Sequence, residues 1–352
     1  MTQPSTGLAG LDNILCGLRK GDNVVWQVDS IGDFKQFVAP FVSAAILDGK
    51  KVIYMRFANH APLVKENNNV VTYHLDAESG FEGFSKQVHS IISKEGVGAY
   101  YVFDCLSDLL SAWATDLMIG NFFMITCPYL FELDTIAYFA LLRGNHSFKT
   151  VARIRETTQL LLDIYNFEGN FYVHPLKVFK RYSPTMFLPH LQQQDNFSPV
   201  ISSIDAATMF SHIWDKGLDS PARRLDYWDR LFMKAEQLTG QPADSKDVID
   251  TIKQLCKIMI GREKRMLSLA ESTLSLDDLL NIKSKLIGSG YIGGKSAGML
   301  LAQNILLKDN SFDWKEYLEP HDSFYIGSNV FYSYIVENGW WKQLIGLCPN
   351  DS

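Results

Sequence analysis

A glycine-rich segment with one lysine is the part of the sequence whose residue types and spacing point most directly to chemistry. Residues 287–301 read Ile-Gly-Ser-Gly-Tyr-Ile-Gly-Gly-Lys-Ser-Ala-Gly-Met-Leu-Leu, and a helix is expected to begin near Ser296. Glycines let backbone N–H groups approach an anion, a helix N-terminus adds the positive end of its dipole, and Lys295 supplies a compact positive charge. The segment predicts a phosphate-binding loop formed by Gly293, Gly294, Lys295 and Ser296.

This segment does not follow the Walker A pattern, which requires glycine, four further residues and then Gly-Lys-Ser/Thr. Gly294, Lys295 and Ser296 match the end of that pattern, but Ser289 stands where its first glycine belongs. A glycine-rich turn that carries a lysine can also be only a tight connection between a strand and a helix. Taken alone, the segment leaves both interpretations open.

A second segment follows downstream and carries a family resemblance. It reads Pro320-His-Asp-Ser-Phe-Tyr-Ile-Gly-Ser328 and precedes a helical pattern over residues 329–338. Together the two segments resemble the opening of the ATP-grasp domain of the pyruvate phosphate dikinase and phosphoenolpyruvate synthase family. There a Gly-Gly-Lys turn leads into a helix, and a Pro-x-x-Phe-x-(Ile/Val)-x-(Ser/Thr) segment comes later. The resemblance covers residues 286–352.

The resemblance implies ATP and Mg²⁺ as cofactors and Lys295 as a catalytic residue that contacts the ATP phosphates. It also implies phosphoryl transfer through a phosphohistidine, to pyruvate or another acceptor. The magnesium-binding carboxylates, the phosphorylated histidine and the pyruvate site would lie in sequence beyond Ser352. We therefore expect the chain to be the N-terminal part of a larger phosphotransferase, inactive by itself.

The N-terminal region carries a different resemblance. Residues 6–15, Thr-Gly-Leu-Ala-Gly-Leu-Asp-Asn-Ile-Leu, and the following Gly17–Trp26 are similar to the opening of RecA-like ATPases of the KaiC type. Where that family has its Walker A loop, Phe34 and Lys35 replace the Lys and Thr, and Val28 and Asp33 replace glycines. Two acids in the loop, Asp29 and Asp33, would repel phosphates. The pattern predicts a degenerate RecA/KaiC-like domain without a Walker A motif, in which Lys35 is either a displaced phosphate ligand or a surface lysine.

Further segments predict a doubly wound, mainly parallel α/β sheet in this domain. Expected strands are residues 51–57, 100–104, 121–126 and 170–174, separated by expected helices at 34–47, 134–142 and 150–165. Asp104 resembles the Walker B carboxylate, which would hold magnesium through water. Without a Walker A loop, the alternative is a structural carboxylate that accepts hydrogen bonds from backbone or from Ser107. Arg143, His146, Arg153 and Arg155 suggest a secondary polar rim at the strand ends.

The sequence pattern changes in the region from 191 to 285. Polar residues 192–196 and Ser198-Pro199 predict a linker, and apolar positions recur at helical spacing over 204–215, 221–239, 245–260 and 276–286. The aromatic residues in these helices are expected to pack the region together or to offer a docking surface; they are Trp214, Tyr227, Trp228 and Phe232. The expected organisation is thus a degenerate RecA-like domain at 1–190, a helical connector at 191–285 and the N-terminal piece of an α+β ATP-grasp domain at 286–352.

Composition excludes several classes of function. The net charge of -6 comes without clustered Lys and Arg, so no nucleic-acid partner is expected. The five cysteines are widely spaced, the histidines have no metal-ligand spacing, and neither a signal peptide nor a membrane span is evident. A cytoplasmic protein with reduced, mostly buried thiols is expected. Whether it forms a homo-oligomer is left open. The competing functional class is a non-catalytic module, whose RecA-like half senses or scaffolds and recruits a phosphorelay partner.

Overall fold

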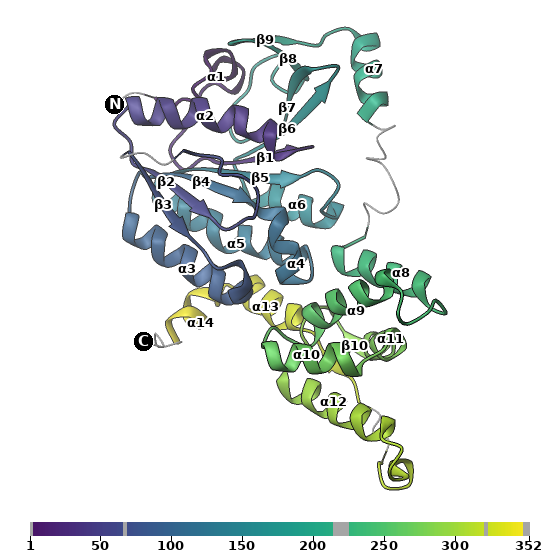
Figure 1. The fold of residues 1–352 in the computed structure, drawn as a ribbon. Helices are drawn as coiled ribbons and strands as arrows, with labels where there is room; N and C mark the ends of the chain where they lie inside the picture. Colours follow the sequence, from purple (N-terminus) through teal and green to yellow (C-terminus); the bar gives the residue numbers. More distant parts are fainter. Residues whose placement is uncertain (1–2, 66–68, 214–224, 320–322, 348–352) are drawn as a thin grey trace. The chain divides into compact units, whose positions relative to one another are not determined.

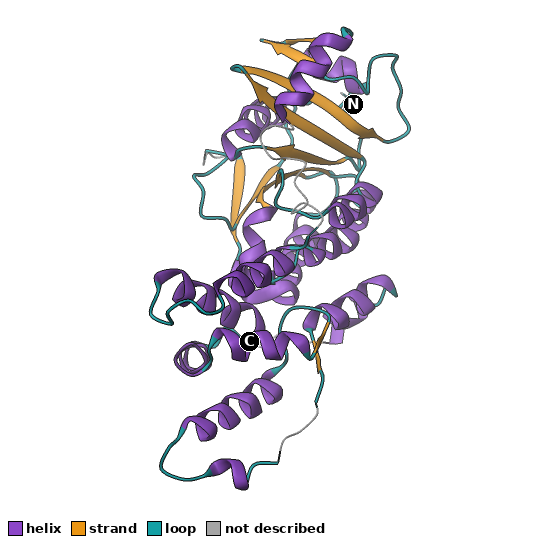
Figure 2. Cartoon of the chain, turned by 90° about the vertical axis from the view of Figure 1, so that its right-hand side faces the viewer, coloured by secondary structure: helices purple, strands orange, loops and turns teal. Residues whose placement is uncertain are grey.

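The computed structural model describes residues 3–65, 69–213, 225–319 and 323–347 (Figure 1). The chain divides into two compact units, one formed by Met1–Leu109 with Phe122–Arg224 and the other by Leu110–Asn121 with Leu225–Ser352. The first unit contains a large sheet, and helices make up most of the second (Figure 2).

The secondary structure of the first part of the chain alternates between strands and helices. In chain order the elements are α1 Ala9–Leu15, β1 Asn23–Val28, α2 Ile31–Leu47, β2 Val52–Arg56, β3 Val70–His74, α3 Gly80–Glu95, β4 Tyr100–Cys105, α4 Leu110–Trp113, α5 Leu117–Glu132, β5 Ile136–Leu142, α6 Phe148–Thr157, β6 Leu160–Phe167, β7 Asn170–Val178, β8 His190–Gln193, β9 Asn196–Pro199 and α7 Ser203–Ile213. Short 3₁₀ turns lie at Ala77–Ser79 and Leu106–Leu109.

The rest of the chain is mainly helical. Its elements are α8 Tyr227–Leu238, α9 Lys246–Met259, α10 Lys264–Thr273, α11 Leu276–Ser284, β10 Leu286–Ile287, α12 Gly294–Lys308, a 3₁₀ turn at Trp314–Glu316, β11 Tyr325–Ile326, α13 Ser328–Glu337 and α14 Trp341–Leu347.

Nine strands form one mixed sheet in the order β3-β2-β4-β5-β1-β6-β7-β8-β9. The strands from β3 to β6 are parallel, and β7, β8 and β9 extend the sheet antiparallel. The central strands β4 and β5 are buried along nearly their whole length, as expected where helices cover both faces of a parallel sheet. The protein therefore has an α/β fold with a mainly parallel mixed sheet, followed by a helical region.

Helices cover both faces of the sheet with aromatic side chains. On one face, Phe37 and Phe41 of α2 stack on Trp26 and Tyr138, with ring centroids 4.8 and 3.9 Å apart. On the other face, Phe122 and Phe123 of α5 pack against Phe103 and Phe139. Burial of such rings is a main contribution to core stability.

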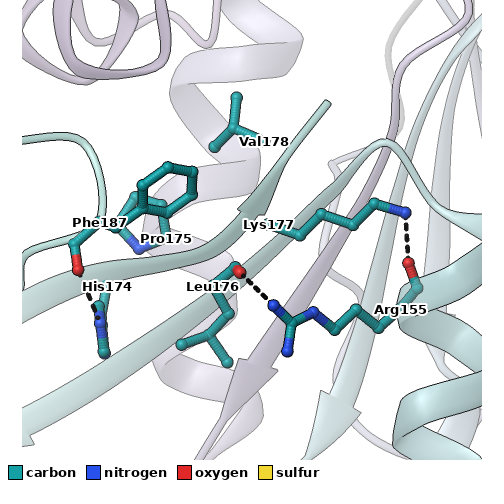
Figure 3. A pocket seen from close by; sticks show the side chains of 7 residues that line it. All are labelled: Arg155, His174, Pro175, Leu176, Lys177, Val178 and Phe187. Atoms are coloured by element: carbon teal, nitrogen blue, oxygen red, sulfur yellow. Dashed lines mark hydrogen bonds between the residues drawn. The ribbon is translucent and has the colours of Figure 1, made fainter. Parts of the chain in front are cut away.

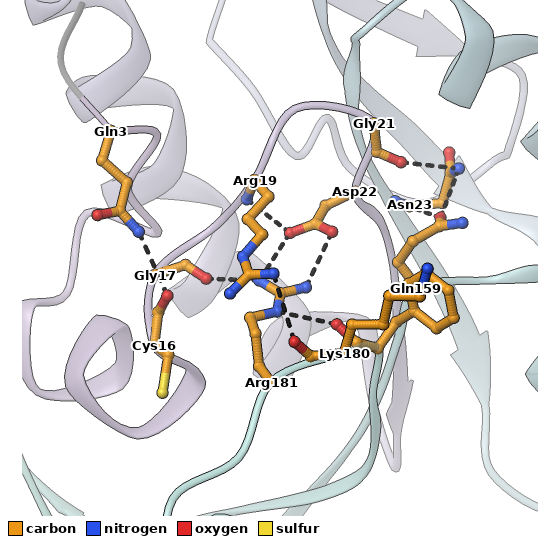
Figure 4. A network of polar contacts seen from close by, with 11 residues as sticks. Gln3, Cys16, Gly17, Arg19, Gly21, Asp22, Asn23, Gln159, Lys180 and Arg181 are labelled. Atoms are coloured by element: carbon orange, nitrogen blue, oxygen red, sulfur yellow. Dashed lines mark hydrogen bonds and ion pairs between the residues drawn. The ribbon is translucent and has the colours of Figure 1, made fainter.

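A buried ion pair fixes the start of β1. Arg181 donates from both terminal nitrogens to the Asp22 carboxylate, at 3.0 and 2.9 Å, and the Arg19 amide donates to the same carboxylate at 2.7 Å (Figure 4). Arg181 also donates to the carbonyl of Gly17 at 2.6 Å. The pair thus joins the segment before β1 to the segment after β7.

Several expected elements are confirmed. The strands expected near 51–57 and 100–104 are β2 and β4, the helix expected at 34–47 is α2, and the strand expected at 170–174 belongs to β7. In the helical region, α8, α9 and α11 lie where the apolar spacing placed helices, and the first residues of the helix expected at 221–239, up to 224, lie outside the described residues. Trp228 and Phe232 pack together in the core of the second unit, whereas Trp214 lies outside the described residues.

Other expectations are wrong. Residues 121–126 lie in helix α5, and residues 134–142 contain strand β5. The single helix expected at 150–165 is α6 followed by strand β6, and the polar linker at 192–199 is the hairpin of β8 and β9. The first two errors have one cause. A buried helix and a strand buried on both faces are both apolar without clear periodicity, so a short apolar run does not distinguish them.

None of the described helices combines the length and the apolar character that crossing a bilayer needs.

Candidate functional site

The glycine-rich loop connects a strand to a helix, as its sequence predicts. β10 ends at Ile287, and α12 begins at Gly294. β10 pairs in parallel with β11, the extended part of the second segment, with Leu286 opposite Tyr325 and Ile287 opposite Ile326. The fold therefore brings the two segments that carry the ATP-grasp resemblance side by side.

Two side chains at the start of α13 hold the loop. Asn329 Oδ1 accepts a hydrogen bond from the Ser289 amide at 2.8 Å, and Ser328 Oγ accepts one from the Tyr291 amide at 3.1 Å. The backbone amides of Asn329 and Ser328 donate in return to the carbonyls of Ser289 and Tyr291, at 3.2 and 3.0 Å. Four hydrogen bonds thus fix the loop from one side, and the amide of Ile292 adds a fifth by donating to Met259 of α9 at 3.0 Å.

The glycines of the loop serve two purposes. Gly288 and Gly290 have φ of 83° and 88°, and a Cβ at either position would collide with the side chains of Asn329 or Ser328. Gly293 also has a positive φ of 83°, but a Cβ there or at Gly294 would meet nothing within 4 Å. The first two glycines allow close packing, whereas the last two face open space.

The N-terminus of α12 is open. Its N-cap residue is Gly293, which makes no side-chain cap hydrogen bond among the described residues. The first amide groups of a helix have no partner within the helix, so those of Gly294, Lys295 and Ser296 point outward at its positive end. Lys295 is exposed and Ser296 is half-buried. The four predicted ligand residues therefore share one accessible helix end with the character of an anion site.

A metal site accompanies neither this loop nor the sheet in the described part of the chain. No group of three or more His, Cys, Asp or Glu there could hold a metal ion. The loop thus offers amide donors and a lysine for an anion, and among the described residues it offers no such ligand group for Mg²⁺.

The turn between β1 and α2, which the sequence comparison aligned with a Walker A loop, is held by its own side chains. Ser30 Oγ accepts from the Asp33 amide at 3.3 Å, and Asp33 Oδ2 accepts from the Ser30 amide at 3.1 Å, which together form a capping box. This box gives the amides of Ser30 and Asp33 partners within the turn. Lys35 lies on the exposed surface of α2 and lines a small pocket with apolar residues of that helix.

A buried arginine neutralises the acid that follows β1. Arg143, at the end of β5, donates to Asp29 at 2.7 Å and to Asp163 of β6 at 2.8 Å, and its guanidinium lies 4.4 Å from the Tyr165 ring centroid. The pKa of Arg143 is raised; burial acts to lower it, but Asp163, Tyr165 and Asp29 outweigh that effect. The sequence interpretation placed Arg143 with Arg153 and Arg155 in a polar rim. Instead, Arg155 donates to the carbonyl of Leu176 at 3.1 Å.

Asp104 is fully buried, and both of its carboxylate oxygens accept hydrogen bonds. Its Oδ2 accepts from Arg56 at 2.5 Å and from the amides of Phe57 and Ala58 at 2.9 Å each, and its Oδ1 accepts from the Tyr54 hydroxyl. The structure therefore supports the structural alternative for this carboxylate, with a correction to its partners.

Ser107 does not bond Asp104. Its hydroxyl lies 2.7 Å from His146 Nε2 and accepts from the Leu142 amide at 2.8 Å. His146, which the sequence placed in the polar rim, thus lies buried beside a serine at the end of β4.

Sequence reasoning missed the roles of Asn329 and Arg143. Asn329 had a usable signal, because an Asn directly after an extended segment and before a helix is a common partner of nearby backbone amides. Arg143 had none, since its partners Asp29 and Asp163 lie 114 and 20 positions away. No protein-family model matches this chain, and no curated protein matches it.

Proposed function

We propose that the loop at 288–296 binds the phosphates of ATP, and that the chain is the N-terminal part of a phosphotransferase that resembles phosphoenolpyruvate synthase and pyruvate phosphate dikinase. ATP would donate its phosphoryl group through a phosphohistidine, with pyruvate as the expected acceptor. The observation that carries the proposal is the parallel pairing of β10 and β11, through which Ser328 and Asn329 hold the loop with Gly293 and Gly294 facing open space.

The binding chemistry follows from the residues at the helix end. The amides of Gly294, Lys295 and Ser296 are donors for phosphate oxygens, and the helix dipole favours their negative charge. The Lys295 ammonium would neutralise charge that develops on the transferred group, so it is the catalytic residue of the proposal. Mg²⁺ would add further charge neutralisation when bound, with ligands from elsewhere.

We further propose that the first unit is a degenerate RecA/KaiC-like domain that does not bind ATP. The capping box at Ser30 and Asp33 and the ion network of Asp29 with Arg143 support this role, because both occupy the place where phosphates would lie. A first unit that does not bind ATP is also compatible with the alternative function, a scaffolding module that recruits a phosphorelay partner.

Titration of the chain with ATP, tripolyphosphate and adenosine tests the proposal, with the amide NMR signals of 293–296 as the readout. ATP and tripolyphosphate should shift these signals, and adenosine should not. Lys295→Ala should weaken ATP binding by about ten- to a hundredfold, because a hydrogen bond to a charged group contributes roughly 1.5–3 kcal/mol. Lys295→Arg should rescue poorly, because a planar guanidinium does not replace a compact ammonium.

Lys264→Ala is the matched control. Lys264 is also exposed in the first turn of a helix, but the Glu263 side chain caps that helix at the amides of Arg265 and Met266. This variant should bind ATP like the wild type. Equal ATP affinity of Lys295→Ala and the wild type, with the fold verified by circular dichroism, would show that the glycines form only a tight turn. Micromolar Mg²⁺-dependent ATP binding that survives Lys295→Ala would refute the proposed role of the first unit.

A further inference from the structure

An open pocket of about 480 Å³ lies along one end of β7 in the first unit (Figure 3). β8 pairs with β7 at Tyr172 and Val173, and residues 174–178 beyond that pairing line the pocket together with Arg155 and Phe187. Its volume falls in the range of small-molecule sites, about 300–1,000 Å³, and its lining combines apolar side chains with a few polar groups, as in such sites.

One end of the pocket is cationic. Arg155 of α6 donates one hydrogen bond, to the Leu176 carbonyl at 3.1 Å, and Lys177 donates to the carbonyls of Arg155 and Glu156. A guanidinium has five donors and an ammonium three, so both groups retain donors for a ligand. The pKa of Lys177 is lowered, first by burial and then by the positive charge of Arg155. A bound anion would relieve this repulsion.

The other end of the pocket is apolar. The Phe187 ring, 44% exposed, lies beside Pro175 (Figure 3). His174 Nε2 lies 3.2 Å from the Phe187 carbonyl, which assigns the proton to that nitrogen, and burial lowers the pKa of His174. A neutral histidine thus holds the backbone of Phe187, whose ring lines the pocket.

We propose that this pocket binds a small monocarboxylate with a flat apolar body. A guanidinium fork matches the geometry of a carboxylate, and Phe187 with Pro175 can cover the body of the ligand. A multiply charged phosphate fits less well. The carbonyls of Arg155 and Glu156 belong to the C-terminal turn of α6, and their partial negative charge opposes an anion in proportion to its charge, so it disfavours a dianion more than a monocarboxylate.

Benzoate, its neutral analogue benzamide and inorganic phosphate are the probes, added to the whole chain and followed by calorimetry and ligand-observed NMR. Benzoate should bind, and benzamide and phosphate should bind at least about tenfold more weakly, since one charge-assisted hydrogen bond contributes about that factor. Arg155→Gln should weaken benzoate binding by about tenfold or more. Lys149→Gln, the same change of charge at an exposed site on α6, should leave it unchanged.

A second pair of variants tests the apolar end. Phe187→Ala removes the ring but keeps the carbonyl that faces His174, and it should weaken benzoate binding severalfold. Phe179→Ala, at an exposed phenylalanine that does not line the pocket, should not. Absence of benzoate binding, equal binding of benzamide or phosphate, or full affinity in Arg155→Gln would overturn the proposal. Lys295→Ala should not change the affinity for benzoate. The proposals for this pocket and for the ATP loop are therefore tested independently.

Discussion

Replacing Asp104 by Asn should destabilise the first unit strongly while removing no catalytic group. Asn has nearly the same shape, so its oxygen can take the place of Oδ2 and keep the bonds from Arg56, Phe57 and Ala58. Its NH₂ group would then face the Tyr54 hydroxyl. That hydroxyl is protonated, because burial and then the bond to Asp104 raise the pKa of Tyr54, and it already accepts from the Leu63 amide at 3.0 Å, so its proton would be left without an acceptor. The variant therefore loses one buried hydrogen bond and the negative charge opposite Arg56.

The magnitude follows from these two losses. A hydrogen bond to a charged group contributes about 1.5–3 kcal/mol, and a fully buried charge left without its partner costs about 3–5 kcal/mol. The second cost is reduced here, because the Arg56 side chain is 16% exposed and water can solvate it. We expect a total of about 2–4 kcal/mol, which corresponds to a fall in melting temperature of roughly 5–15 °C for a unit of this size.

Urea unfolding followed by circular dichroism measures this effect, and hydrogen exchange of the β4 amides reports on the first unit alone. Asp48→Asn is the matched control, since Asp48 is exposed at the end of α2 and should change stability by no more than about 0.5 kcal/mol. An unchanged unfolding midpoint in Asp104→Asn would refute the structural role. So would a Mg²⁺-dependent stabilisation of the wild type that disappears in the variant, because it would mean that Asp104 still helps to bind metal.

Three further outcomes are expected. Asn329→Ala should speed hydrogen exchange at the Ser289 amide and weaken ATP binding severalfold, because the loop loses one of its anchors; unchanged exchange would contradict this. Asp33→Ala should cost about 1 kcal/mol through loss of its half of the α2 capping box, without creating ATP binding, as urea unfolding and calorimetry can check. Asp278 caps α11 and has a lowered pKa: burial acts to raise it, but hydrogen bonds from Ser275 and the charge of Lys308 outweigh burial. Its contribution to stability should therefore be present above the unfolded-state pKa of about 4 and be lost as pH falls through the lower folded-state pKa. The urea midpoints of Asp278→Asn and the wild type should accordingly differ at pH 7 and converge near pH 2.

The turn at the candidate site could be predicted from the sequence because its signal is local. The glycines and Lys295 lie within a few positions of one another, and the turn into α12 is dictated by those residue types. The mismatch with a Walker A pattern is equally local, since Phe34 and Asp33 stand where that pattern has its lysine and a glycine. The strands at β2 and β4 were evident because short β-branched and aromatic runs are flanked by helical patterns.

The region from 121 to 142 shows where local patterns fail. Helix α5 and strand β5 are both apolar and both buried, so their residues carry no periodicity that separates one from the other. Packing decides the outcome. β5 has β1 and β4 as its neighbours in the sheet, and α5 covers one face of that sheet.

The sequence by itself thus determined where the glycine-rich turn into a helix lies, and which residues after β1 depart from a Walker A pattern. Tertiary structure alone decided their partners: Arg143 for Asp29, Tyr54 and Arg56 for Asp104, and Asn329 for the glycine-rich loop. The physical reason is sequence separation. Residue type fixes what a side chain can donate or accept, but which groups meet across tens of positions depends on the order of strands in a sheet, and no local signal encodes that order.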